Sequence, residues 1–266
     1  NQIETCNPEV VTAYVSVSTD KGKVNTNFGK SDVSVYLDGS KIKNFEFKAV
    51  DTAKSPLSNM LLIDHSGSMD ARSMSNAKSA AKQYVGKLKS GDQAGLIKFD
   101  NKVETLVPMT TDKSKVTSAI DGIQPRGDTS IFDAIAKGVD SVPDCGRKAV
   151  TVLTDGEDTT SANYTQKSVI EKANKENLPV FAVGIKSPDF DPSAIRSIAD
   201  KSGGQYLEAN TPTEIDSIYD KINSQLTGQF VANFKVELDK NGSKHTLKIV
   251  SEVEGSDTGS ERVFVF

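Results

Sequence analysis

Apolar residues in the middle of the chain follow two patterns that alternate. Short, nearly continuous apolar runs, typical of parallel strands covered on both faces, occupy residues 60–63, 94–97, 149–153 and 180–183. Between and after these runs, apolar residues recur every three or four positions, as in amphipathic helices, within 77–88, 131–139, 194–199 and 215–222. This alternation predicts an α/β fold with a doubly wound, mostly parallel sheet and helices on both of its faces.

The two ends of the chain instead show the period of two that is typical of β-strands. Near the N-terminus the alternation covers 11–17 and 33–37, where it leads into Asp38-Gly39, a dipeptide that favours a tight hairpin turn. The same period continues through 45–49 and returns at 230–238, 247–249 and 262–266. These segments predict short strands on either side of the α/β region.

Neither end is long enough to bury a sheet face by itself, because isolated hairpins are only marginally stable in water. We therefore expect the ends to combine into one small β-sandwich, made from residues 1–56 and 228–266. The α/β domain, residues 57–227, would be inserted between its halves. Two unrelated β-extensions are the alternative.

Charge and hydropathy narrow the classes of partner. The 266 residues include 32 Lys+Arg and 36 Asp+Glu, with a formal net charge of −4. Since no run of Lys and Arg is dense, nucleic acids and anionic membranes are not expected partners. No apolar run approaches the roughly 20 residues that cross a bilayer, so we expect no transmembrane segment in this chain. The first residues lack a signal-peptide pattern, so an exported protein would be present in its mature or trimmed form.

The two cysteines, Cys6 and Cys145, fit neither a zinc cluster nor a redox Cys-x-x-Cys pair. They predict one long-range disulfide, with two unpaired thiols as the alternative. A disulfide would indicate an extracytoplasmic protein, whether secreted, periplasmic or on the cell surface.

The most informative segment, Asp64-His65-Ser66-Gly67-Ser68-Met69, directly follows the first buried run. Asp64, Ser66 and Ser68 occupy alternate positions of a loop, so a tight turn can direct all three oxygens to one point. Carboxylate and hydroxyl oxygens without His or Cys suit a hard divalent cation such as Mg²⁺ or Mn²⁺. A plain strand-to-helix turn, in which Ser and Asp cap the helix, is the alternative.

Two further loops are expected at the same edge of the sheet, where α/β proteins bind their ligands. Gly127-Asp128-Thr129-Ser130 precedes a predicted helix, and Thr154-Asp155-Gly156-Glu157-Asp158 follows the third buried run. With adjacent strands, Thr129 and Asp155 would face the loop that begins at Asp64.

Together the three loops resemble the metal-ion-dependent adhesion site (MIDAS) of von Willebrand factor type A domains, over about residues 59–225. The resemblance implies that Ser66 and Ser68 bind Mg²⁺ directly, with Mn²⁺ or Ca²⁺ as alternatives. It implies that Asp64, Thr129 and Asp155 bind the ion directly or through water. The flanking β-segments resemble the small sandwich that accompanies this Rossmann-like domain in several bacterial and surface proteins.

The expected function is metal-dependent adhesion to another protein. Mg²⁺ requires near-octahedral oxygen coordination, so one position would remain for an incoming oxygen, and an Asp or Glu of a partner would supply it. The residues Asp128, Glu157 and Asp158 are expected to form the rim around this contact. The side chain of His65 should point away from the ion, so His65 is expected to be a packing or a rim residue.

Two other functions compete with this interpretation. A Mg²⁺-dependent phosphoryl-transfer enzyme would use Asp64 as its nucleophile, but it needs a second acid two residues later, where the chain has Ser66. No phosphate-binding loop and no Ser/His/Asp or Cys/His set is present, so we expect a protein that is not an enzyme. A scaffold that assembles complexes inside the cell is the second alternative.

Overall fold

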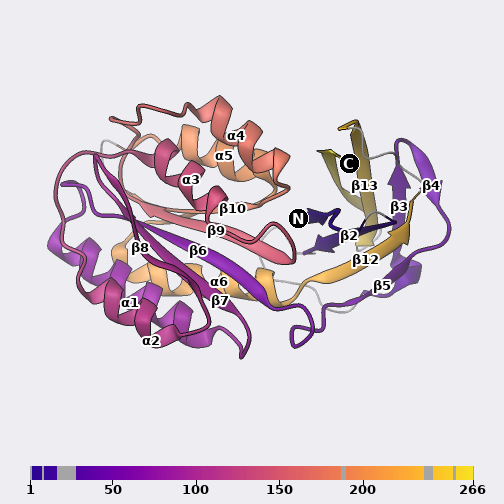
Figure 1. Cartoon of the computed structure of the whole chain (residues 1–266), viewed down its shortest axis with the longest axis horizontal. Coiled ribbons are helices and arrows are strands. Elements are labelled where there is room, and N and C mark those ends of the chain that lie inside the picture. The colour runs from indigo at the N-terminus through magenta and orange to yellow at the C-terminus, as the bar shows by residue number, and fades with distance from the viewer. Residues whose placement is uncertain are drawn as a thin grey trace. The chain divides into compact units, whose positions relative to one another are not determined.

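The computed structural model describes residues 2–7, 9–16, 28–186, 190–236, 242–253 and 256–265. The chain divides into two compact units, one formed by residues 52–223 and the other by residues 1–51 together with 224–266. The second unit therefore contains both ends of the chain, with the first inserted between them in sequence (Figure 1). Positions 17, 237–238 and 266 of the predicted strands lie outside the described residues.

The unit of residues 52–223 is built on a six-stranded sheet in the order β11-β10-β9-β6-β7-β8. Its strands are β6 (Leu57–Asp64), β7 (Gln93–Phe99), β8 (Val103–Thr110), β9 (Arg147–Thr154), β10 (Val180–Ile185) and β11 (Tyr206–Ala209). Neighbouring strands are parallel except for β7 and β8, which are antiparallel. The predicted mostly parallel sheet is confirmed.

Helices cover both faces of this sheet, as the alternating pattern predicts. Figure 1 shows α3, α4 and α5 on one face and α1, α2 and α6 on the other. The helices are α1 (Ala71–Lys87), α2 (Lys113–Asp121), α3 (Ile131–Asp140), α4 (Gln166–Lys175), α5 (Ser193–Ser202) and α6 (Ile215–Thr227), with the short 3-10 helices η1 (Lys30–Asp32) and η2 (Pro212–Glu214). Every residue of β9 is buried, which is the burial pattern of a strand covered on both sides.

Packing between the sheet and α3 positions the loops that follow the strands. Leu62 of β6 and Val152 of β9 share one hydrophobic core with Ile131 and Ile135 of α3. All four side chains are at most 3% exposed. Because these contacts fix the start of α3 against the sheet, the loop before it lies beside the carboxyl ends of β6 and β9.

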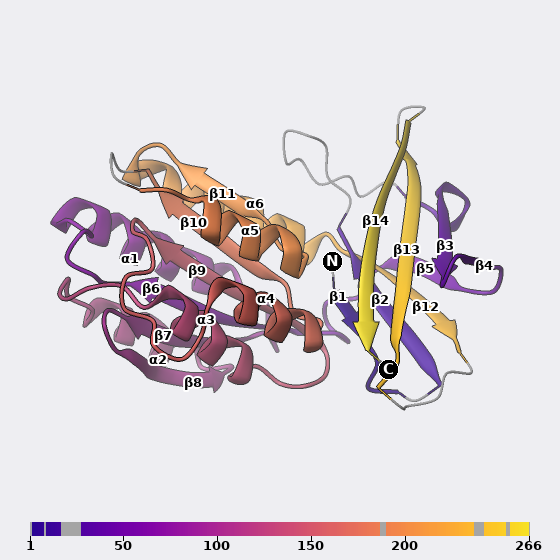
Figure 2. The same ribbon diagram turned by 90° about the horizontal axis from the view of Figure 1, so that it is seen from above.

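The other unit contains two four-stranded antiparallel sheets, in the orders β1-β2-β12-β5 and β14-β13-β3-β4. The strands are β1 (Gln2–Glu4), β2 (Val10–Val15), β3 (Val33–Leu37), β4 (Ser40–Ile42), β5 (Glu46–Ala49), β12 (Phe230–Lys235), β13 (Lys244–Val253) and β14 (Ser256–Val265). Figure 2 shows β13 and β14 running side by side along the second sheet. One hydrophobic core takes Val11 and Phe234 from the first sheet and Val35 and Ile249 from the second, an arrangement that fits a β-sandwich.

The turn at Asp38-Gly39 joins β3 to β4, and both residues have positive φ, 49° and 78°. This confirms the predicted hairpin. The next strand, β5, does not extend it. Instead β5 pairs with β12 in the other sheet, with Ala49 opposite Phe230.

Candidate metal-binding site

The loop that follows β6 is fixed by the side chain of Asp64, the last residue of that strand. Asp64 is fully buried, and one of its carboxylate oxygens accepts a hydrogen bond from the backbone N–H of Ser66 at 2.8 Å. The other oxygen accepts a hydrogen bond of 2.5 Å from the hydroxyl of Thr154, the last residue of the adjacent strand β9. These bonds tie the loop to the carboxyl ends of two neighbouring strands.

Ser66, Ser68 and Asp155 form a continuous chain of hydrogen-bonded oxygens. Ser66 Oγ lies 2.9 Å from Ser68 Oγ, and Ser68 Oγ donates to Oδ1 of Asp155 at 2.7 Å. Ser66 and Asp155 are buried, whereas Ser68 is exposed. The loop after β6 and the loop after β9 are therefore in direct contact through these oxygens. The row of hydrogen-bonded oxygens reaches the protein surface at Ser68.

Backbone hydrogen bonds hold the loop before α3 against the loop after β6 and the loop after β9. The N–H of Gly67 donates to the carbonyl of Gly127 at 2.8 Å. On the other side, the N–H groups of Thr159 and Thr160 donate to the carbonyl of Thr129 at 2.8 and 3.0 Å. The position of Thr129 is therefore set by both loops.

The absence of a side chain at Gly156 leaves room beside these oxygens. A Cβ atom at this position would lie 3.4 Å from Ser68 Oγ and 3.4 Å from Thr129 Oγ1. The two hydroxyls therefore border the same point, next to Asp155. All five predicted ligands thus gather at one edge of the sheet, on three loops.

The two buried carboxyls of this cluster favour the binding of a positive charge. Burial raises the pKa of the Asp64 carboxyl to about 6, against the hydrogen bonds from Thr154 and Ser66, and the charge of Asp155 raises it further. Burial also raises the pKa of Asp155. Among the described residues, no cationic side chain acts on the Asp64 carboxyl to lower its pKa. A divalent cation would supply the charge that keeps both carboxyls ionised.

The donor set itself fits a hard cation. It consists of two carboxylates and three hydroxyls, the oxygen ligands that Mg²⁺, Mn²⁺ and Ca²⁺ prefer. In the described part of the chain, this site included, no group of three or more His, Cys, Asp or Glu side chains is placed to hold a metal ion. Any cation held here would therefore depend on the hydroxyls of Ser66, Ser68 and Thr129.

The four predicted rim residues have different surroundings. Asp128 and Glu157 are exposed, and Glu157 accepts a hydrogen bond from the N–H of Asp191. Asp158 is half-buried and accepts a hydrogen bond from the N–H of Phe132 in the first turn of α3, so it caps that helix. Of the two roles expected for His65, the rim role is wrong, because its side chain is only 1% exposed, and this burial fits the packing role.

His65 belongs to a polar network that sequence reasoning missed. Its Nδ1 lies 2.9 Å from the carbonyl of Gln124, and its Nε2 lies 3.8 Å from Asp100. Burial opposes ionisation of Asp100, but hydrogen bonds from the N–H of Lys102 and from Arg126 outweigh this effect and keep its pKa below the usual value. Asp100 directly follows β7, as Asp64 ends β6, and this position at a strand end was the signal that could have identified it.

Comparison with known proteins identifies the family. Residues 60–221 match the model of the von Willebrand factor type A domain, so the chain belongs to this family. Domains of this family are typically non-enzymatic modules that often mediate protein–protein interaction or adhesion. Among the described residues, no helix combines the length and apolar character needed to cross a membrane.

The relatives are distant. An uncharacterized protein of Synechocystis sp. is 24% identical over 203 residues, which cover 74% of this chain and 48% of the relative. Inter-alpha-trypsin inhibitor heavy chain H3 of Bos taurus is 25% identical over 214 residues, covering 71% of this chain and 24% of the relative. The chain therefore spans about half the length of the first relative and a quarter of the second.

Solved structures share the fold at low sequence identity. A von Willebrand factor type A protein from Catenulispora acidiphila superposes with a TM-score of 0.60 at 14% identity, covering 99% of this chain and 74% of the other. Proximal thread matrix protein 1 from the mussel byssus gives a TM-score of 0.60 at 20% identity, covering 71% of this chain and 51% of the other. These similarities establish the fold.

Proposed function

We propose that this protein is a divalent-metal-dependent adhesion module. Asp64, Ser66, Ser68, Thr129 and Asp155 would hold Mg²⁺, with Mn²⁺ or Ca²⁺ as alternatives. The bound cation would accept a carboxylate from an Asp or Glu of a partner protein. The observation that supports this most directly is the chain of oxygens from Ser66 through Ser68 to Asp155.

The ligand count supports the acidic partner. Five side chains that bind the ion directly or through water leave one position of an octahedral site, and a hard cation favours another oxygen there. Ser68, the exposed member of the set, lies at the protein surface, where a partner can approach. The exposed carboxylates of Asp128 and Glu157 nearby would repel acidic surfaces that lack a matching cationic residue, and so would contribute to the choice of partner.

Thermal unfolding in Mg²⁺ and in EDTA tests the metal site. A cation that binds only the native state stabilises it by about 2.7 kcal/mol at a hundredfold excess over its dissociation constant. For a chain of this size, we expect the midpoint to rise by about 5 °C. Asp64→Ala should lose this rise, whereas Asp128→Ala should keep it. A rise of equal size in Asp64→Ala would contradict the proposed site.

A peptide-display selection tests the acidic partner. Peptides bound to the wild-type protein in Mg²⁺ should be enriched in Asp or Glu and should be released by EDTA. Asp64→Ala should not retain them. Bound peptides that lack a carboxylate requirement, or that resist EDTA, would argue against the cation as the acceptor.

We also propose that the protein acts outside the cytoplasm, with Cys6 bonded to Cys145. Neither cysteine is a free thiol in the structure. The PilB minor pilin of Streptococcus sanguinis, a surface component by its name, shares the fold with a TM-score of 0.52 at 14% identity. A thiol titration of the denatured protein under non-reducing conditions should find no thiols. Two titratable thiols would favour the intracellular scaffold instead.

A further inference from the structure

We propose that the β-sandwich unit carries a second binding site, for an acidic sugar, in a pocket of about 580 Å³. This volume lies within the range of about 300–1,000 Å³ that is usual for small-ligand sites. The pocket is formed where β2, β12 and β5 lie next to η1, and the lining residues that matter here are Thr12, Lys30, Asn44, Phe45, Asn233 and Lys235. None of the proposed metal ligands belongs to this unit.

The pocket carries uncompensated positive charge. Lys30 and Lys235 both line it, and the ammonium group of neither forms an ion pair or a hydrogen bond with any residue that the structure describes. The Nζ of Lys30 lies 4.9 Å from the centre of the Phe45 ring, which holds this ammonium group at the pocket. The acidic lining residue, Glu46, is 3.2 Å from Lys48. The two remaining ammonium groups therefore favour a ligand with a carboxylate.

The other polar groups of the pocket match hydroxyls. Asn233 lies on the central strand of the three, opposite Thr12 on β2 and Glu46 on β5. Its Oδ1 is buried and has no hydrogen-bond partner within the described chain. A buried acceptor in this state destabilises the protein unless a donor reaches it. The amides of Asn44 and Asn233 and the hydroxyl of Thr12 can donate and accept hydrogen bonds, as the hydroxyls of a sugar do.

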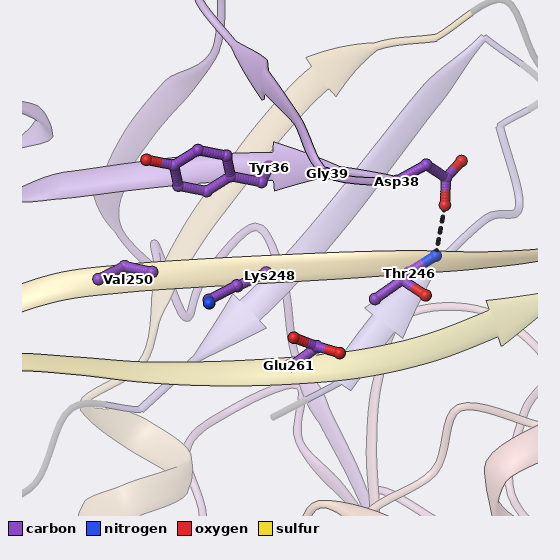
Figure 3. A pocket seen from close by; sticks show the side chains of 7 residues that line it. All are labelled: Tyr36, Asp38, Gly39, Thr246, Lys248, Val250 and Glu261. Atoms are coloured by element: carbon purple, nitrogen blue, oxygen red, sulfur yellow. Dashed lines mark hydrogen bonds between the residues drawn. The ribbon is translucent and has the colours of Figure 1, made fainter.

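A larger hollow on the other sheet lacks these features. This hollow, of about 770 Å³, lies over β3, β13 and β14 (Figure 3). Lys248 and Glu261 stand directly opposite each other on neighbouring strands, so their charges offset one another. Asp38 is already hydrogen-bonded to the N–H of Thr246 at 2.8 Å. Among the residues that line this hollow, carboxylates outnumber ammonium groups and no buried polar atom lacks a hydrogen-bond partner, so nothing there favours an acidic sugar.

Calorimetric titration of the full chain with D-glucuronate, in EDTA, tests the proposal. We expect saturable binding that weakens at least about tenfold in Lys235→Ala, because a hydrogen bond to a charged group is lost. Lys41→Ala, which alters an exposed lysine of β4 in the other sheet, outside the pocket lining, should bind like the wild type. Binding in EDTA separates this site from the proposed metal site, since loss of the cation should leave it intact.

Two reference ligands define the chemical class. D-glucose lacks the carboxylate and acetate lacks the sugar hydroxyls, so each should bind at least about tenfold more weakly than D-glucuronate. Equal affinity for acetate would show a simple anion site and would overturn the proposal, as would the absence of glucuronate binding or an equal loss in Lys41→Ala.

Asn233→Leu separates binding from folding. The variant removes the unsatisfied buried oxygen, so its thermal midpoint without sugar should match or exceed that of the wild type. Its affinity for D-glucuronate should nevertheless fall at least about tenfold. Unchanged affinity in a folded Asn233→Leu protein would contradict the role given to this amide.

Discussion

The hydroxyl of Ser68 donates a hydrogen bond of 2.7 Å to Oδ1 of Asp155, a residue 87 positions away along the chain. The bond joins the loop after β6 to the loop after β9. Both oxygens are proposed metal ligands. Because they lie within hydrogen-bond distance without a cation, folding alone brings them together. A cation that binds between preformed ligands need not order these loops, which favours binding.

Ser68→Ala should separate metal binding from folding. The lost hydrogen bond is at the surface and should lower the stability of the metal-free protein by about 1 kcal/mol or less. The rise of the thermal midpoint in Mg²⁺ should fall to less than half of the wild-type rise. Ser161→Ala, which removes a hydroxyl bonded to Asp158, is the matched control and should keep the full rise. An undiminished rise in Ser68→Ala would remove this hydroxyl from the ligand set.

Asp64→Asn should stabilise the metal-free protein at neutral pH. Burial raises the pKa of Asp64 to about 6 in the folded state, above the usual value near 3.8. The folded protein therefore holds this proton more tightly than the unfolded chain does. The contribution of Asp64 to the free energy of unfolding is greatest below about pH 4 and is lost as the pH rises through 6. Asn carries no charge and avoids this loss, a gain of about 2 to 3 kcal/mol at pH 7.5.

Urea unfolding in EDTA at pH 4.5 and pH 7.5 measures this difference. The advantage of Asp64→Asn should be small at the lower pH and full at the higher one. In Mg²⁺ at pH 7.5 the order should reverse, because only the wild type gains from the cation. An advantage that does not depend on pH would refute the raised pKa.

Breaking the proposed Cys6–Cys145 disulfide should destabilise the protein. Closing a loop of this length restricts the unfolded chain, which is worth about 4 to 5 kcal/mol in the chain-entropy model. The thermal midpoint of the wild type should therefore fall in dithiothreitol. The double variant Cys6→Ser/Cys145→Ser should start lower and should not respond to the reductant. If it does respond, the effect has another origin.

At two glycines, replacement by alanine should change the stability of the protein in opposite directions. At Gly86, in α1, a Cβ atom would meet nothing within 4 Å, so Gly86→Ala should raise stability by about 0.5 to 1 kcal/mol through helix propensity. At Gly204 the same atom would lie 2.0 Å from the carbonyl oxygen of Val180, so Gly204→Ala must displace the backbone beside β10. Chemical denaturation of both variants should show a gain for the first and a loss of several kcal/mol for the second.

The periodicity of apolar residues predicted which faces of the strands are buried better than it predicted which strands pair with each other. The four buried runs became β6, β7, β9 and β10, because a strand covered on both faces must be apolar throughout. The segment 45–49 shows the right alternation, yet β5 joins β12 rather than the hairpin before it. Alternation reports which side chains are buried, and the partner strand depends on contacts far away in sequence.

The elements that were not predicted have weak local patterns. The strand β8 lies at the sheet edge, and only Val107 of its residues is buried, so it shows no continuous apolar run. The helix α4 buries only Val169 and Ala173, which is too few apolar positions to reveal a helical period.

At the candidate site, the sequence predicted the metal-binding residues but not the environment of the residues beside them. Asp64, Ser66 and Ser68 stand close together in sequence, and their spacing in a loop after a strand indicates a shared target. His65 is buried, and its ring lies beside Asp100 and Gln124, which come from other loops. A single position inside a motif cannot show whether its side chain faces solvent or the interior.

The pairing of β2 with β12 has a consequence for the order of folding. Val15 and Phe230 stand opposite each other in one sheet, although they come from opposite ends of the sequence. During synthesis, the ribosome releases the whole α/β unit before it releases β12. The α/β unit can therefore fold first, while the early strands wait for their partners. Until then β2 has an unpaired edge, and a nascent chain stalled in this interval would be the form most prone to aggregate.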